Sequence, residues 1–324
     1  MALSRRRLPL VGAVMLCASA CFGEYVPDEA SQSTTLPTTG SSSAESSVAS
    51  SSGEPLSCDH VDLLILTDVS VSMAPFANGI VDVLLALGTE IEESLAGVGT
   101  YRIALAYNAP PIVNQGAFSV PDGGEGCTQV GALVRGRDAC VEEFGGRPFL
   151  TEGDDLGSGL TCLADGVISG NLNAAYERPR ILDTMLAVLG ADEDPTLAAC
   201  NEGFYEAPAP LVVIVVADAD DESDATVLEA VTQAVATQDT PNLRSIGVFV
   251  IGADASQCPT EDENECGAEP ACRVQEFIDR GFINTGLEGN VRRFNICRSL
   301  EEDIADVAGA LLTQLSAVVV EVCG

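Results

Sequence analysis

The sequence predicts a doubly wound α/β fold, in which a mainly parallel sheet carries helices on both faces and disulfide-stapled loop insertions. Two observations lead to this prediction. Four short runs are continuously rich in Val, Ile and Leu, which is typical of strands covered on both faces; they are VDLLILT, TYRIALAY, LVVIVVA and SIGVFVIG. Segments with apolar residues three and four positions apart, the spacing of an amphipathic helix, alternate with these runs. Such alternation favours parallel pairing with helices on both sides.

The elements of the folded region, residues 58–324, follow in order. After the first strand, apolar positions from 76 to 95 predict a helix, and the second strand covers 100–107. Residues 108–178 are rich in Gly and fit no simple repeat, so we expect elaborated loops with room for one short strand. The remaining elements are a helix at 179–190, a strand at 211–217, a helix capped by Asp224, a strand at 245–252 and a helix at 300–318.

The charge composition excludes several functions. The chain of 324 residues has 49 acidic residues against 15 basic ones, every one of them Arg, and its formal net charge is -34. Without lysine it can form neither a P-loop nor a Schiff base. Nucleic acids and anionic membrane surfaces require basic patches, so neither is expected as a direct partner.

The N-terminal residues 1–21 predict an export signal. Three arginines precede an apolar run at 8–20 that is too short to span a membrane. The sequence CASAC is similar to the lipobox of bacterial lipoproteins, which implies that Cys21 receives lipid and becomes the mature N-terminus. The alternative is a secretory signal cleaved after Ala20. SRRRLPL is also similar to a twin-arginine signal, so the export route stays open.

Residues 22–57 are dominated by Ser and Thr and show no apolar periodicity. Such a segment cannot bury enough surface to offset its ordering entropy, so we expect a disordered tether. At 36 residues (57 − 21) it would span about 33 Å as a flexible coil. A lipid anchor followed by a tether would hold the folded domain away from a membrane.

Removal of the signal leaves ten of the twelve cysteines (12 − 2), an even number in an exported chain. Disulfides are therefore expected, and the lack of a CxxC pair does not favour a zinc site. Cys127 with Cys140 is a plausible local pair, whereas Cys58 with Cys323 could join the ends of the domain. The acidic segment 258–272, CPTEDENECGAEPAC, is interpreted as a disulfide-pinned surface loop.

Oxygen-bearing side chains follow two of the predicted strands. Asp68, Ser70 and Ser72 alternate after the first, and Asp218 follows LVVIVV. In doubly wound sheets, ligands bind beyond the carboxyl ends of the strands, where the strand order reverses. Carboxylate and hydroxyl oxygens suit Mg²⁺, Mn²⁺ or Ca²⁺. Because hydroxyls are neutral, such an ion would keep charge for the carboxylate of a partner.

These residues resemble the von Willebrand factor A (VWA) family, whose metal-ion-dependent adhesion site (MIDAS) has the motif DxSxS. Asp68, Ser70 and Ser72 match the motif fully. VVADADDES is similar to a later strand of the family that ends in Thr-Asp-Gly, which places Asp218 as a ligand although Ala217 and Ala219 replace the flanking residues. The resemblance covers about 58–323 and implies a Rossmann-like VWA fold.

The last ligand of that family is a Thr in a loop before a helix, and the loop before PRILDTMLAVLG contains none. Glu177 stands near the corresponding place and would give a tighter but less electrophilic ion. Thr151 and Thr161 are more distant candidates. The export signal, the tether, CLADG and YERP together resemble bacterial envelope lipoproteins with such a domain, which implies an outer-membrane lipoprotein that faces the periplasm or the surface.

Other chemistries have weaker support. Carboxylates at 218, 220, 222, 224 and 229 follow the spacing of an EF-hand loop, but Ser223 stands where Gly is needed. Aspartate-nucleophile phosphatases require a second acid where Ser70 lies, and a lysine. A Ser/His/Asp hydrolase lacks a GxSxG motif, and His60, the single histidine, lies just before the first strand. We therefore do not expect an enzyme.

The sequence as a whole favours an envelope-tethered binding or adhesion module. It would hold Mg²⁺, or Ca²⁺ or Mn²⁺, at the DxSxS site and engage an acidic group on a protein or another envelope ligand. Only the lipid anchor would contact the membrane. The loops at 108–178 and 258–272 would shape specificity around the ion. A metal-dependent hydrolase and a structural domain with a vestigial site are the alternatives.

Overall fold

The computed structural model describes residues 58–68, 71–73, 76, 88, 91, 95, 98–107, 127, 130–134, 144–168, 179–190, 194–205, 209–238, 242–253, 258, 268–297 and 304–323. All of them lie in the second of two units into which the chain divides, Ser52–Gly324. The predicted export signal at 1–21 and tether at 22–57 lie outside the described residues. So do Cys21, Ser70 and Glu177.

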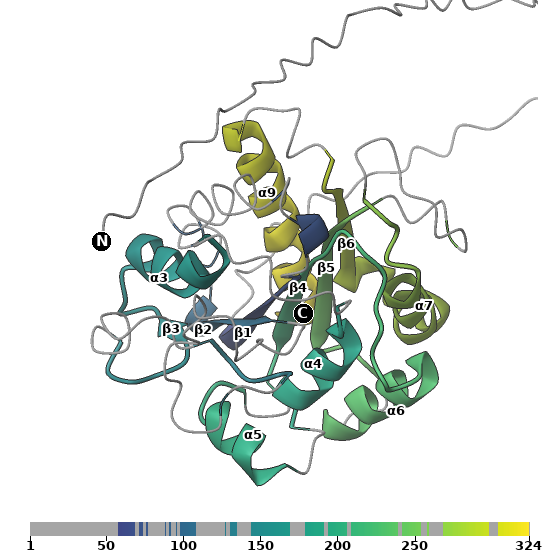
Figure 1. Ribbon diagram of the computed structural model, residues 1–324, viewed down its shortest axis with the longest axis horizontal. Coiled ribbons are helices and arrows are strands. Elements are labelled where there is room, and N and C mark those ends of the chain that lie inside the picture. Colours follow the sequence, from purple (N-terminus) through teal and green to yellow (C-terminus); the bar gives the residue numbers. More distant parts are fainter. Residues whose placement is uncertain are drawn as a thin grey trace, which may run out of the picture. The chain divides into compact units, whose positions relative to one another are not determined.

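The described strands form one sheet of six, in the order β3-β2-β1-β4-β5-β6 (Figure 1). Their bounds are β1 Cys58–Thr67, β2 Val98–Tyr107, β3 Leu150–Thr151, β4 Leu211–Val216, β5 Ile246–Gly252 and β6 Val291–Asn295. All neighbours pair in parallel except β3, which runs antiparallel to β2. The predicted mainly parallel α/β sheet is confirmed, and β3 is the one short strand for which 108–178 had room.

The strand order reverses at β1. From β1 the chain first builds β2 on one side and later returns to place β4 on the other side. Thr67 aligns with Tyr107 of β2 and with Val216 of β4, so all three strands end at the same level. This carboxyl end of the sheet is the place where doubly wound folds bind ligands.

The two faces of β1 are covered by different helices, as a continuous apolar run requires. Leu63 belongs to one apolar cluster with residues of α3 and α9, whereas Leu64 belongs to another with residues of α4, α6 and α7. Figure 1 shows the same division, with α3 and α9 on one side of the sheet. The helices are α3 Leu156–Ile168, α4 Ile181–Val188, α5 Pro195–Cys200, α6 Val227–Thr237, α7 Cys272–Gly281 and α9 Ile304–Cys323. None of the described helices is long and apolar enough for a membrane span.

Two expectations about helices were wrong. Residues 156–168, predicted as loop, form α3, in which Leu160 and Leu163 are buried. Asp224 does not cap α6: Thr226 does, through a capping box with Glu229, and Asp224 instead pairs with Arg180. The predicted helix at 76–95 lies largely outside the described residues.

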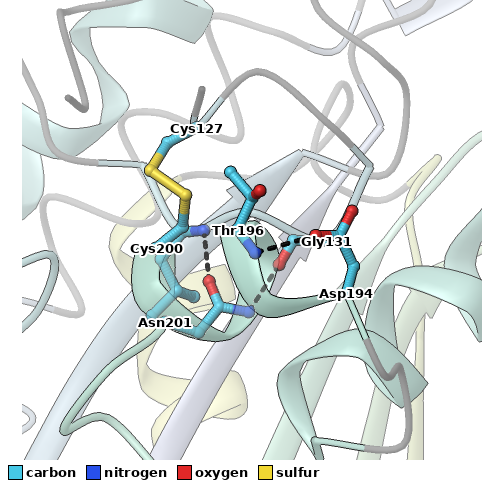
Figure 2. Close-up of a disulfide and its surroundings, with 7 residues drawn as sticks. Cys127, Gly131, Asp194, Thr196, Cys200 and Asn201 are labelled. Carbon is cyan, nitrogen blue, oxygen red and sulfur yellow. Dashed lines mark hydrogen bonds between the residues drawn. A yellow bond between two sulfur atoms is a disulfide. The ribbon is translucent and has the colours of Figure 1, made fainter. Parts of the chain in front are cut away.

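One disulfide joins segments that are far apart in the sequence. Cys127 bonds to Cys200 at the end of α5, so the predicted pairing with Cys140 was wrong. The reason is that α5 lies against residues 130–134: the side chain of Asn201 accepts from Leu133 N at 2.9 Å and donates to Gly131 O at 2.9 Å (Figure 2).

Cys258 bonds to Cys272, which confirms the disulfide-pinned loop at 258–272. Cys162, Cys297 and Cys323 are also disulfide-bonded. The side chain of Cys58 lies outside the description, so its link to Cys323 stays a prediction. Several disulfides in one domain indicate an oxidising, extracytoplasmic compartment.

Candidate metal centre

Asp68 and Asp218 meet where the strand order reverses. Asp68 directly follows β1, and its N–H donates to Val216 O of β4 at 2.8 Å. Asp218 comes two residues after β4. Both are buried, at 0% and 1% exposure. The expectation that these two strand ends converge is therefore confirmed, and it follows from β1 and β4 being neighbours.

Ser72 contacts one of the two aspartates. It lies in a short 3-10 helix, η1 Val71–Met73, where the next side chain, Met73, is buried in the core while Ser72 is exposed. The Ser72 hydroxyl donates to Asp218 Oδ1 at 3.0 Å. Burial of Met73 thus anchors η1 on the core and leaves the Ser72 hydroxyl directed toward Asp218.

The electrostatics of Asp218 are unusual for a surface loop. Burial, and next the charge of Asp68, raise its pKa to about 7, while the Ser72 hydrogen bond acts in the opposite direction. Asp218 Oδ2 is buried and has no hydrogen-bond partner. Two acids in a site of low polarity repel each other, and a buried acceptor left without a donor is costly.

A divalent cation would relieve both problems. Carboxylate and hydroxyl oxygens are the ligands that Mg²⁺ and Ca²⁺ prefer, so the residues present fit such an ion. Among the described residues, no three His, Cys, Asp or Glu side chains gather as a metal site. The donor set here is different, because it combines two carboxylates with the Ser72 hydroxyl.

The other predicted ligands divide into two groups. Ser70 and Glu177 lie outside the described residues, so their places at the site stay predictions. Thr151 and Thr161 are occupied elsewhere. Thr151 Oγ1 donates to Asp154 Oδ2 at 3.0 Å, and Thr161 Oγ1 donates to Gly157 O of its own helix at 2.7 Å.

The segment that follows Glu177 lies against the loop that carries Asp218. Glu222 N donates to Pro179 O at 2.7 Å, and Asp183 N of α4 donates to Ser223 Oγ at 2.9 Å. The chain therefore brings the start of α4 to the loop after β4. A metal ligand from the residues that precede α4 would need this proximity.

The role of Asp221 was not predicted from the sequence. Asp221 Oδ1 accepts from Ile181 N at 2.6 Å and from Leu182 N at 3.2 Å, so it caps α4 from a different loop. The role of Arg273 on α7, which contacts the same loop, was not predicted either. Two local features of the sequence could have pointed to these roles: the apolar helix α4 has no capping residue of its own, and an arginine directly follows Cys272.

The carboxylates that follow the EF-hand spacing serve separate contacts, in agreement with the absence of the required Gly at Ser223. Asp220 Oδ1 accepts from Asp221 N and from Arg273 N, both at 2.8 Å. Asp224 pairs with Arg180, and Glu229 closes the capping box of α6.

The acidic loop at 258–272 reaches the site at its end. Glu269 N donates to Asp218 O at 2.7 Å, so the residues just before α7 contact the backbone of the candidate ligand. The expectation that this loop lies on the same rim as the site is confirmed for the residues described.

His60 lies at the opposite end of β1. Its Nε2 is 2.7 Å from Asp62 Oδ1 and its Nδ1 is 2.7 Å from Thr100 Oγ1. Asp68 lies eight positions along the chain from His60, a distance of about 26 Å in a strand. The histidine therefore takes no part in the candidate metal centre.

Comparisons with known proteins find only distant likeness. No family model matches the sequence, and no curated protein matches it. Proximal thread matrix protein 1 from the mussel byssus is 11% identical with a TM-score of 0.37, over 80% of this chain and 49% of that chain. Its structure with a zinc-occupied MIDAS motif gives 0.36 at 11% identity, over the same shares of the two chains. The pilus adhesin SpaC from Lactobacillus rhamnosus GG is 11% identical with a TM-score of 0.34, over 78% of this chain and 30% of that chain. This chain thus spans less than half of either protein, and likeness of this degree assigns no function to it.

Proposed function

We propose that this protein is an exported binding module that holds a divalent cation and uses it to engage a carboxylate of a partner. One observation carries the proposal: Asp68 and Asp218 lie buried together at the strand-order reversal, with Asp218 Oδ2 lacking a hydrogen-bond partner. The DxSxS motif and its resemblance to the VWA family support the same reading.

Asp68, Ser70, Ser72 and Asp218 would hold the ion, with Glu177 as a further candidate. The bound cation would supply positive charge and a coordination position for an oxygen anion. The protein keeps the site in place before binding: Asp68 N bonds to β4, and the Ser72 hydroxyl orients the Asp218 carboxylate. Mg²⁺ is the first candidate, and Ca²⁺ and Mn²⁺ have the same preference for oxygen.

Titration calorimetry with Mg²⁺, Mn²⁺ and Ca²⁺ tests this proposal. Wild type should take up one ion, and Asp68→Asn should lose that uptake. Asp59→Asn is the matched control, because Asp59 is an exposed residue at the other end of β1. A wild type that binds none of the three ions would end the proposal.

The same variants separate the alternatives. Cation-dependent hydrolysis of a phosphoester that Asp68→Asn abolishes would instead indicate an enzyme. A domain that folds equally well and binds nothing would indicate a vestigial site. A pull-down from envelope extract, with and without EDTA, would then show whether capture of a partner depends on the ion.

We further propose that the domain is an outer-membrane lipoprotein, attached through Cys21 and the tether at 22–57. The CASAC sequence and the disulfides of the folded domain support this proposal. Mass spectrometry of the mature protein should find diacylglyceryl on Cys21. A soluble chain that begins with unmodified Cys21 would refute the anchor without affecting the cation site.

A further inference from the structure

We infer that Asp221 and Arg273, here called the loop clamp, position the candidate cation site without touching the ion. The inference rests on the proposed function and adds a positioning pair to it. The loop between β4 and α6 carries both Asp218 and Asp221. It has no regular structure, so its backbone groups need partners from elsewhere.

Arg273, in the first turn of α7, supplies donors to three of the loop's backbone carbonyl groups. Its Nη1 donates to Asp221 O at 3.0 Å and to Ser223 O at 2.9 Å, and its Nη2 donates to Ala225 O at 2.7 Å. Its backbone N–H donates to Asp220 Oδ1 at 2.8 Å. One residue thus contacts four positions of the loop, beginning two residues after Asp218.

Asp221 connects the same loop to α4. The residue that precedes α4, Arg180, provides no side-chain cap, and Asp221 Oδ1 accepts from Ile181 N and Leu182 N instead. Ser223 Oγ donates to Asp221 Oδ1 at 2.6 Å. A carboxylate at a helix N-terminus is favourable because it satisfies free amides and complements the helix dipole.

The two members of the loop clamp also balance each other's charge. The Asp221 side chain is 0% exposed, and its Oδ2 makes no hydrogen bond but lies 3.4 Å from Arg273 Nη1. A buried carboxylate requires a nearby positive charge, and removal of one partner leaves the other uncompensated.

The loop clamp therefore joins both segments on which the proposed site depends. Asp218 lies three residues before Asp221, and Glu177 lies four residues before Ile181. Glu269 N, four residues before Arg273, bonds to Asp218 O at 2.7 Å and adds a third link. A loosened loop clamp would let these segments separate, and preorganisation of the site would be lost.

Arg273→Met tests the loop clamp, because it removes the guanidinium and keeps an unbranched side chain. The matched control is Arg280→Met on the same helix, where Arg280 is half exposed and pairs with Glu276. In the metal-free protein, we expect the amides of Ile181 and Leu182 to exchange about tenfold faster in Arg273→Met. Mg²⁺ or Ca²⁺ affinity should fall about tenfold, and neither quantity should change in the control.

The two readouts keep the two proposals apart. If wild type takes up no cation, the proposed function fails, and the role of the loop clamp at a cation site fails with it. Amide hydrogen exchange at Ile181 and Leu182 in Arg273→Met then shows whether the loop clamp holds α4 at all. If wild type binds but Arg273→Met exchanges and binds as wild type does, the loop clamp is refuted. Faster exchange with unchanged affinity also refutes it as a positioning device. If Arg273→Met does not fold, Arg273→Lys replaces it. This variant keeps the positive charge but loses the several N–H donors of the guanidinium. Smaller changes in amide exchange and in cation affinity are then expected.

Discussion

Buried carboxylates at the two ends of β1 have different kinds of neighbouring side chain. At the amino end, Asp62 is completely buried and has His60 Nε2 at 2.7 Å. At the carboxyl end, Asp218 is equally buried, and the charge that acts on it most is that of another acid, Asp68. The first carboxylate has a histidine nitrogen within hydrogen-bond distance in the same chain, whereas the second has a geometry that a cation from solution would complete. Burial alone therefore does not mark a binding site; the charge of the neighbour does.

Asp221 extends the comparison, because it belongs to the first kind although it lies three residues from Asp218. It has Arg273 Nη1 at 3.4 Å and several donors on its other oxygen. Its role is structural, whereas the charged neighbour of Asp218, three residues earlier, is another acid, Asp68. Two acids of one loop thus have neighbours of opposite charge.

The largest test removes the unbalanced acid. The pKa of Asp218 is raised from 3.8 to about 7 in the metal-free folded protein. Between about pH 4 and about pH 7, the folded state therefore keeps a proton that the unfolded state has lost. The free energy of unfolding decreases as the pH rises through this range. Asp218→Asn should remove this cost and stabilise the metal-free protein at about pH 8, by up to roughly 4 kcal/mol. Its cation affinity should drop at least about 100-fold, more than the loss of an outer partner causes.

Urea unfolding at several pH values, with and without Mg²⁺, measures both effects. In wild type, the cation should restore the stability that is lost toward neutral pH, because it binds only the folded state. A metal-free Asp218→Asn protein that is less stable than wild type at about pH 8 would contradict the view that the two acids repel each other.

The second test weakens the support of the carboxyl end. Cys258→Ser with Cys272→Ser opens a link of sequence separation 14, which by chain entropy costs about 3 kcal/mol. Since Glu269 N bonds to Asp218 O beside this link, we expect a several-fold loss of cation affinity as well. Cys127→Ser with Cys200→Ser is the control, as that disulfide lies at α5. It should destabilise the fold and leave ion binding by the folded protein unchanged.

The smallest expected change concerns the amino end. His60→Ala removes the imidazole that lies 2.7 Å from the carboxylate of buried Asp62, at a cost of roughly 1–3 kcal/mol. The loss should be seen in thermal or urea unfolding, with cation affinity equal to that of wild type. A marked effect of His60→Ala on ion binding would mean that the two ends of the sheet are coupled, which the comparison does not allow.

Local patterns made the sheet predictable, together with three of the five candidate ligands, the three that the structure brings to one end of it. Continuous Val, Ile and Leu runs identified the long strands, and Asp68, Ser72 and Asp218 were found because each lies within a few residues of a strand end. The remaining features depend on contacts between distant residues. The partner of Cys127 is 73 positions away, and the cap of α4 comes from Asp221, 40 positions after Ile181.

The missed helix α3 shows a different limit. Its sequence, LGSGLTCLADGVI, has three glycines, which have low helix propensity. Gly159 is explained by tertiary packing, since a Cβ there would come within 2.7 Å of the Leu150 side chain on β3. The close approach of helix and strand needs the glycine, and packing overrides the propensity.

The outer strands of the sheet have a consequence for how a partner could dock. On one side, β3 is only two residues long, and on the other, β6 carries Arg292 and Arg293 among its five residues. Short or charged edge strands discourage the addition of a strand from another chain. Recognition by backbone pairing along the sheet is thus disfavoured, and a partner would approach across the strand ends, with its side chains first.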